Sequence, residues 1–264
     1  MTHTTQSWQW YEQNAQIYQE MDPATVEFGR QLLDYADPPP GARLLDVGAG
    51  RGAVAGQAAA RGCAVTAIDA APSMVTQLRE DFPGITVSRM DAHRFDFADG
   101  EFDVVTAGFV LDLLSDPAAA LAETRRVLRP GGVVALSVPG LLPHRERWQW
   151  LVDLAQEFYP TAIQEDTPPE ATVDIPTLLA GTGFTGQNRR DFHLPVPIAG
   201  PLALWELFAA RLPMAESTGA VVRQPRDRAE EFRRRFLSGA RRMHAGGGIA
   251  MDRHMIMYRA AKPS

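Results

Sequence analysis

Residues 43–53 read RLLDVGAGRGA, an apolar run followed by three glycines at alternate positions and then by an alanine-rich segment over residues 53–61. The apolar run predicts a short buried strand, and the alanine-rich segment predicts a helix. Glycine permits a tight turn between them and lets a ligand approach bare backbone. The helix start offers free N–H groups and a positive dipole end, which suit a carboxylate or a phosphate. This strand–turn–helix arrangement is typical of nucleotide-binding α/β folds.

Two classes of cofactor fit this turn. Gly48, Gly50 and Ala53 match the dinucleotide fingerprint G-x-G-x-x-G/A, and Asp69 follows at about the 20-residue distance that this fingerprint requires. Asp46 favours a different ligand, because a carboxylate at the end of the first strand would repel a pyrophosphate and attract an ammonium group. A cofactor that contains an amino acid is therefore preferred, and an NAD-dependent dehydrogenase is the less favoured alternative.

Further apolar runs predict the remaining strands of one sheet. Strands are expected at 64–68, which ends at Asp69, at 85–89, which leads to Asp91 and Ala92, and at 102–107, 133–138, 184–192 and 251–260. Helical periodicity is expected over residues 7–35, 148–158, 172–180, 202–212 and 227–242. Acidic side chains at the ends of successive parallel strands would share one edge of the sheet, where ligands bind.

Four motifs in this order resemble the class I S-adenosylmethionine-dependent methyltransferases. They are Leu44–Gly52, Asp69, Asp91–Ala92 and the sequence LRPGG over residues 128–132. The nearest resemblance is to small-molecule enzymes of quinone biosynthesis and bacterial secondary metabolism, and it covers about residues 40–140. It implies an α/β fold: a Rossmann-like, seven-stranded, mostly parallel sheet with helices on both faces, one antiparallel strand at 251–260, and a helical cap.

The resemblance also implies how the chain is divided. Residues 1–264 would form a single methyltransferase domain, with an N-terminal helical lid over 1–40 and a cofactor-binding half over 41–140. Two insertions, residues 140–175 and 193–245, would build the cap over the substrate.

By the same resemblance, the cofactor is S-adenosyl-L-methionine and the product S-adenosyl-L-homocysteine. Asp46 would orient the ammonium group, Asp69 would hold the ribose, and Asp91 with Ala92 would read the adenine edge. The residues expected to line the cofactor are Asp46, Gly48, Ala49, Gly50, Gly52, Asp69, Ala70, Met74, Asp91, Ala92, Ala107, Phe109 and, from the lid, Tyr11 and Tyr18.

The methyl acceptor is expected to be a small, apolar or aromatic metabolite, methylated on O, N or C by in-line displacement. The reason is that Trp148, Trp150, Trp205 and Phe208 lie in segments that the sheet does not need. A hydroxyl acceptor would also need a general base. The candidates are His144, His193 and Asp112, and no histidine–carboxylate motif distinguishes among them; His93 is interpreted as a solvated loop residue. The alternative function is cofactor binding without methyl transfer, as a scaffold or a rearrangement catalyst.

Composition limits the partners. The net charge of −6 argues against a broad surface for binding nucleic acid. Residues 107–110 read Ala-Gly-Phe-Val and do not match the Asp/Asn-Pro-Pro-Tyr motif of methyltransferases that act on the amino groups of nucleic-acid bases. No stretch is long and apolar enough for a membrane span. The single cysteine, Cys63, excludes an intrachain disulfide and a cysteine-based metal site, and no metal is expected. A cytoplasmic location is the resulting expectation, and the oligomeric state is left open.

Overall fold

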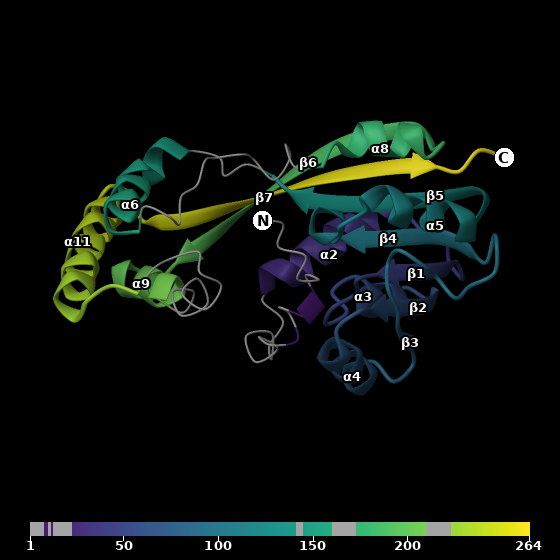
Figure 1. Ribbon diagram of the computed structural model, residues 1–264, viewed down its shortest axis with the longest axis horizontal. Coiled ribbons are helices and arrows are strands. Elements are labelled where there is room, and N and C mark those ends of the chain that lie inside the picture. The colour runs from purple at the N-terminus through teal and green to yellow at the C-terminus, as the bar shows by residue number, and fades with distance from the viewer. Residues whose placement is uncertain (1–7, 10–11, 13–22, 141–144, 160–172, 210–222) are drawn as a thin grey trace. The chain divides into compact units, whose positions relative to one another are not determined.

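A seven-stranded sheet forms the centre of the protein, in a computed structural model (Figure 1) that describes residues 8–9, 12, 23–140, 145–159, 173–209 and 223–264. The strand order is β3-β2-β1-β4-β5-β7-β6. The strands are β1 (Arg43–Val47), β2 (Ala64–Asp69), β3 (Thr86–Arg89), β4 (Phe102–Gly108), β5 (Leu128–Pro139), β6 (Thr185–Ile198) and β7 (Ile249–Ala261).

The parallel pairing of the strands places five carboxyl ends at one edge of the sheet. β1 pairs in parallel with β2 and β4, β2 with β3, and β4 with β5. β7 runs antiparallel to β5, with Val134 opposite Ala260. The predicted fold class is therefore confirmed, including the antiparallel strand, and the loops that follow β1 to β4 lie together.

The helix α5 (Pro117–Val127) begins where the sequence supplies the usual signals. Asp116 caps α5 by accepting a hydrogen bond from the Ala119 amide at 3.0 Å, and Pro117 opens the helix. The described helices are α2 (Pro23–Ala36), α3 (Ala55–Ala60), α4 (Pro72–Asp81), the 3₁₀ turn η2 (Leu111–Leu113), α5 (Pro117–Val127), α6 (Arg145–Phe158), α8 (Ile175–Gly181), α9 (Pro201–Ala209) and α11 (Arg226–Ala245). None of the helices in these described ranges is long and apolar enough to cross a membrane.

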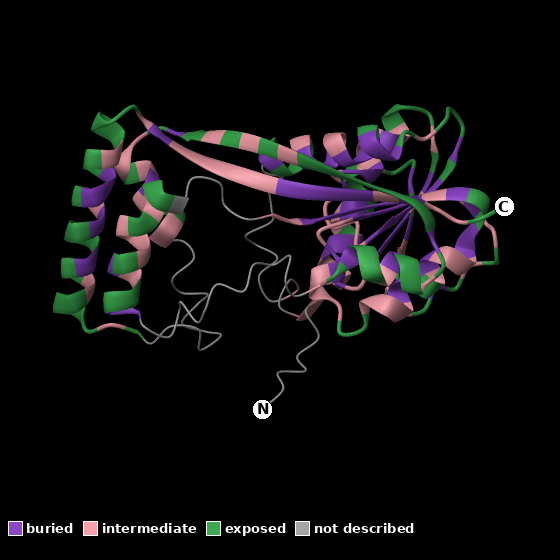
Figure 2. Cartoon of the chain, turned by 90° about the horizontal axis from the view of Figure 1, so that it is seen from above, coloured by how far each residue is buried: buried purple, intermediate pink, exposed green. Residues whose placement is uncertain are grey.

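Burial of apolar strand residues holds the sheet in place. Leu44 and Leu45 of β1 are fully buried, and Figure 2 shows buried residues concentrated along the central strands. The side chains of β4, β5, α8 and β7 contribute to the same apolar cluster, which includes Leu136, Leu179 and Ile256. Burying each such side chain contributes about 1.5–3 kcal/mol, so the sheet provides a rigid base for the loops at its edge.

The chain divides into two compact units. One comprises Met1–Gly140, Pro169–Phe192 and Met255–Ser264, and the other comprises Leu141–Pro168 and His193–His254. The proposed roles of lid, cofactor half and cap remain predictions.

The second unit has an aromatic core of its own. Phe232 and Phe236 of α11 are fully buried, and the Trp205 and Phe208 rings of α9 lie 5.2 and 5.1 Å from the Phe236 ring. Trp150 of α6 lies 5.7 Å from the same ring. The aromatic residues from which the sequence predicted an apolar acceptor thus pack against one another within this unit.

Candidate functional site

The glycine turn after β1 leaves one position open. Gly48, Gly50 and Gly52 all have positive φ angles, of 63°, 52° and 85°, which side chains rarely adopt. A methyl group added at Gly48 would lie 2.4 Å from Val110, and one added at Gly52 would lie 2.5 Å from Leu78. At Gly50 the added carbon would meet no atom within 4 Å. Two glycines are therefore required by packing, whereas Gly50 faces free space in which a ligand can lie.

Asp69, at the end of β2, holds the glycine turn in place. One carboxylate oxygen accepts the Gly50 amide at 2.9 Å, and the other accepts the Ala71 amide at 2.9 Å. Desolvation raises the pKa of Asp69, and these backbone bonds offset part of the increase. Each oxygen has a further lone pair, so the carboxylate can still accept hydrogen bonds from two ligand hydroxyls.

Asp46 is buried behind the turn, with an exposed fraction of 2%. It accepts the Thr106 hydroxyl at 2.8 Å and the Ala55 amide, at the start of α3, at 3.1 Å. Desolvation raises the pKa of Asp46 to about 7, and the two bonds only partly oppose this effect. The carboxyl group joins β4 to the first turn of α3, and an ammonium group nearby would favour its ionised form. Its predicted role in orienting that group stays a prediction.

The loop after β3 contains a histidine–carboxylate pair that the sequence did not reveal. His93 Nδ1 lies 2.6 Å from Asp91, whose carboxylate also accepts the His93 amide at 2.9 Å. Desolvation opposes ionisation of Asp91, but the bonds from His93 outweigh it and lower the pKa of this carboxyl group. His93 Nε2 accepts the Asp116 amide at 3.3 Å, which links this loop to the start of α5. His93 is a partly exposed loop residue, as the sequence indicated, and its imidazole in addition ties this loop to Asp91 and to the start of α5.

Phe109, directly after β4, has a left-handed backbone with φ of 57°. Its amide donates to the Ser137 carbonyl at 2.9 Å, which holds this conformation in place. The Phe109 ring lies edge-on to Phe28 of α2 at 5.6 Å, and Phe28 lies 6.0 Å from Phe192 of β6. A left-handed conformation in a non-glycine residue is uncommon and costs energy, and such strain occurs often at functional sites. No sequence signal indicated this aromatic group.

Asp112 lies in η2, three residues after Phe109. Its Oδ1 atom is buried and has no hydrogen-bond partner among the residues that the structure describes. Desolvation raises the pKa of Asp112. Val110, in the same loop, is the residue that would contact a methyl group added at Gly48, so this segment lies against the glycine turn.

The other predicted cofactor residues of the first unit occupy the same edge. The Ala49 amide donates to Ile68 at 3.0 Å, and the Ala70 carbonyl accepts from Arg89 at 3.0 Å. Met74 and Ala107 are buried, and Ala92 is half-buried against the core. Their contacts with a cofactor stay predictions.

Three predicted residues lie outside the described part of the chain, namely Tyr11, Tyr18 and His144. His193 belongs to the second unit, where its ring stacks on that of His254 at 4.1 Å. A catalytic role for His193 is therefore neither supported nor contradicted by its contacts.

Comparison with known proteins finds a family match within the first unit. Residues 45–136 match a family described as a methyltransferase domain. This stretch of the chain is a methyltransferase domain. Its similarity to nocamycin O-methyltransferase of Saccharothrix syringae is 40% identity over 139 residues, which cover 48% of this chain and 50% of that protein. The chain is also 38% identical to demethylmenaquinone methyltransferase of Beutenbergia cavernae over 117 residues, which cover 43% of this chain and 49% of that protein.

A solved structure extends the comparison of the methyltransferase fold. Phosphoethanolamine N-methyltransferase 2 of Haemonchus contortus, solved with phosphomonomethylethanolamine and S-adenosylhomocysteine, superposes with a TM-score of 0.51 at 19% identity, covering 89% of this chain and 52% of that one. The chain thus spans about half the length of the curated relatives described above. The predictions of family and fold are confirmed, whereas the substrate must be argued from this chain's own residues.

Proposed function

We propose that this protein binds S-adenosylmethionine and transfers its methyl group to a small organic acceptor. The observation that carries the proposal is the open face at Gly50, whose amide is held by Asp69. The relatives' names and the S-adenosylhomocysteine in the solved structure support the same cofactor. A carboxylate at the end of β2 suits the ribose hydroxyls, as in other nucleotide-binding sheets.

The residues at the sheet edge fit the different parts of this cofactor. Asp46 provides a buried negative group for the amino-acid ammonium, and Asp69 provides acceptors for the ribose. The loop held by His93 carries Asp91 and Ala92 toward the adenine. When bound, the sulfonium group supplies an activated methyl, so the protein has to orient the acceptor in line and exclude water. Holding reactants in this way can lower the barrier by about 7–11 kcal/mol.

The acceptor is proposed to be apolar or aromatic. The basis is the group formed by Phe28, Phe109 and Phe192, whose rings lie edge-on at 5.6 and 6.0 Å beside the end of β4. Aromatic rings also offer a large apolar surface, which suits a flat, apolar ligand. Two of the relatives act on nocamycin and demethylmenaquinone, as their names state. A cytoplasmic location and a bacterial source are part of the same proposal.

Calorimetric titration tests the cofactor. We expect S-adenosylmethionine and S-adenosylhomocysteine to bind the full chain in the micromolar range (about −8 kcal/mol) and NADH not to bind. Binding of NADH alone would contradict the proposal and support the dehydrogenase alternative. Cofactor binding with no methylated product across a panel of phenols, quinols and polyketides would favour the alternative of a scaffold or rearrangement catalyst.

A matched pair of glycine variants tests the open face of the turn. Gly50→Ala and Gly62→Ala both introduce a side chain at a positive φ, of 52° and 82°, and neither new carbon meets an atom within 4 Å. Each should cost about 1 kcal/mol of stability, because the left-handed conformation is strained for alanine. Only Gly50→Ala should weaken S-adenosylhomocysteine binding, by about tenfold or more, if the ligand occupies that space. Equal affinities in the two variants would show that the cofactor lies elsewhere.

A further inference from the structure

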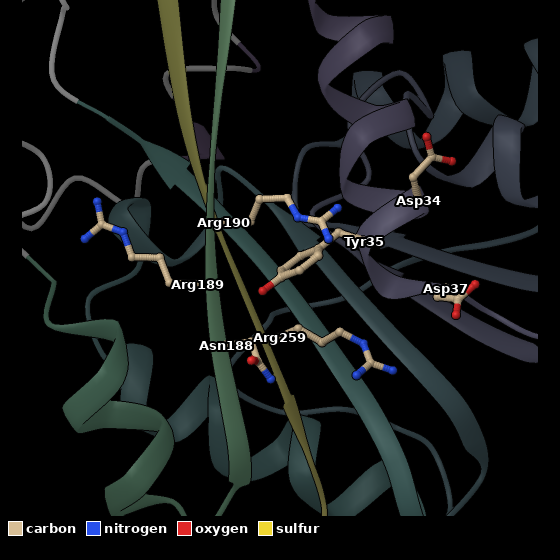
Figure 3. Close-up of a pocket in the computed structure, with 7 residues that line it drawn as sticks. All are labelled: Asp34, Tyr35, Asp37, Asn188, Arg189, Arg190 and Arg259. Carbon is tan, nitrogen blue, oxygen red and sulfur yellow. The ribbon is translucent and has the colours of Figure 1, made fainter.

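A pocket of about 400 Å³ lies in the first unit, away from the glycine turn. It is formed by the end of α2, by β6 and by β7, and Figure 3 shows the side chains that line it. Its size is within the range of small-molecule sites. None of its lining residues belongs to the proposed cofactor site, so the two sites can be tested separately.

Two buried donors in this pocket have no partner. Tyr35 of α2 has an exposed fraction of 7%, and its hydroxyl makes no hydrogen bond within the described ranges. Nε of Arg259, from β7, is likewise buried without a partner in the same ranges. Buried polar atoms are nearly always hydrogen-bonded, and leaving one unsatisfied costs about 1–3 kcal/mol. Two such atoms at one pocket indicate a missing acceptor.

The charges around these donors point to an anion. The guanidinium carbon of Arg190, from β6, lies 4.7 Å from the centre of the Tyr35 ring. Neither Arg190 nor Arg259 has a carboxylate within ion-pair distance among the residues that the structure covers. Desolvation raises the pKa of Tyr35, so its hydroxyl stays protonated and remains a donor.

The acidic residues at the pocket do not neutralise this group. Asp34 already accepts from Arg30 at 2.7 Å and forms a second ion pair with Arg61. Asp37 is exposed, and Figure 3 shows both carboxylates directed away from the Tyr35 ring. The donors of Tyr35, Arg190 and Arg259 therefore remain available to a ligand.

We propose that this pocket binds a phosphoryl group. The three donors come from three different elements, α2, β6 and β7, and line one pocket, and a phosphoryl group offers three acceptor oxygens where a carboxylate offers two. Guanidinium groups bind such oxygens through short, charge-assisted hydrogen bonds. The ligand is either free phosphate or the phosphate end of a larger molecule, for which a pocket of about 400 Å³ has room.

Calorimetric titration of the full chain with inorganic phosphate, phenyl phosphate and benzoate tests the proposal. Arg259→Gln should weaken phosphate binding by about tenfold or more, and Tyr35→Phe by about fivefold, because each removes one donor to a charged ligand. Arg189→Gln is the matched control. Arg189 is paired with Asp191 at 3.0 Å, and Figure 3 shows it pointing away from the Tyr35 ring, so the phosphate affinity of this variant should change less than about twofold.

The outcomes separate clearly. Tighter binding of phenyl phosphate than of inorganic phosphate identifies a phosphorylated organic ligand, and equal binding identifies free phosphate. No saturable binding, equal affinity in all variants, or benzoate binding as tight as phenyl phosphate would overturn the proposal. Tyr35→Phe removes only a hydroxyl that makes no described bond, so without ligand this variant should be at least as stable as the wild type in thermal unfolding, which keeps the test valid. The inference does not depend on methyl transfer or on the cofactor.

Discussion

Replacing Asp69 with alanine is expected to weaken S-adenosylmethionine binding by about 100-fold, equivalent to about 2.7 kcal/mol. In the proposed complex the carboxylate accepts hydrogen bonds from two ribose hydroxyls, and bonds to a charged group are worth about 1.5–3 kcal/mol each. The substitution also releases the Gly50 and Ala71 amides, which Asp69 holds at 2.9 Å. Titration with S-adenosylmethionine and S-adenosylhomocysteine measures the loss for both ligands.

The control must show that the fold survives. Asp174→Ala is suitable, because Asp174 accepts the Thr177 amide at 3.1 Å as the cap of α8, far along the chain from the proposed site. Each variant loses a side-chain carboxylate that accepts hydrogen bonds from backbone amides, so each should lower the free energy of unfolding by about 1–2 kcal/mol. Only Asp69→Ala should lose cofactor affinity. If both variants bind the cofactor as the wild type does, Asp69 does not contact the ribose.

The sequence was informative where local chemistry determines the structure. Arg43–Val47 was predicted as a strand and is β1. The alternating glycines were expected to turn the chain, and all three have positive φ angles. A short strand and a tight turn depend mainly on neighbouring residues. The run of apolar side chains and the alternating glycines were therefore sufficient to predict them.

Contacts between distant residues could not be predicted in this way. His93 and Asp91 are close in the sequence, but the bond from the Asp116 amide to His93 depends on how two loops meet. The Phe28–Phe109–Phe192 group joins α2, the loop after β4 and β6, and Phe109 needs its neighbours to hold a strained backbone. One sequence shows which residue types are present but not which of them converge.

The ends of the later strands show the same limit. The periodicity predicted strands over 184–192 and 251–260, whereas β6 runs to Ile198 and β7 begins at Ile249. The extra residues of β6 alternate between exposed and at least half-buried, and the two prolines among them, Pro195 and Pro197, argue against a strand when only the sequence is considered. Trp205 and Phe208 suggested an apolar acceptor from the sequence, and the structure shows that both pack on α11.

Replacing Asp112 with asparagine is expected to lower the turnover of a hydroxyl acceptor by about 100-fold or more, with cofactor affinity unchanged. Asp112 follows the end of β4, its Oδ1 atom lacks a hydrogen-bond partner in the described structure, and desolvation raises the pKa of its carboxyl group. A base whose pKa lies nearer the working pH removes a proton more effectively, and such catalysis contributes about 10²–10⁴-fold. Only the ionised form accepts a proton, so the wild-type rate should fall as the pH decreases through this raised pKa.

Stability separates this role from a structural one. The raised pKa means that the folded protein favours the protonated carboxyl, so the ionised group lowers stability as the pH rises above its ordinary value of 3.8. An amide side chain does not ionise, and thermal unfolding at about pH 8 should show Asp112→Asn at least as stable as the wild type. Asp116→Asn, which keeps a capping side chain on α5, is the matched control and should leave turnover unchanged. Full turnover in Asp112→Asn with a hydroxyl acceptor would exclude the base, whereas reduced turnover together with unchanged or higher stability would place the missing proton acceptor at this carboxylate.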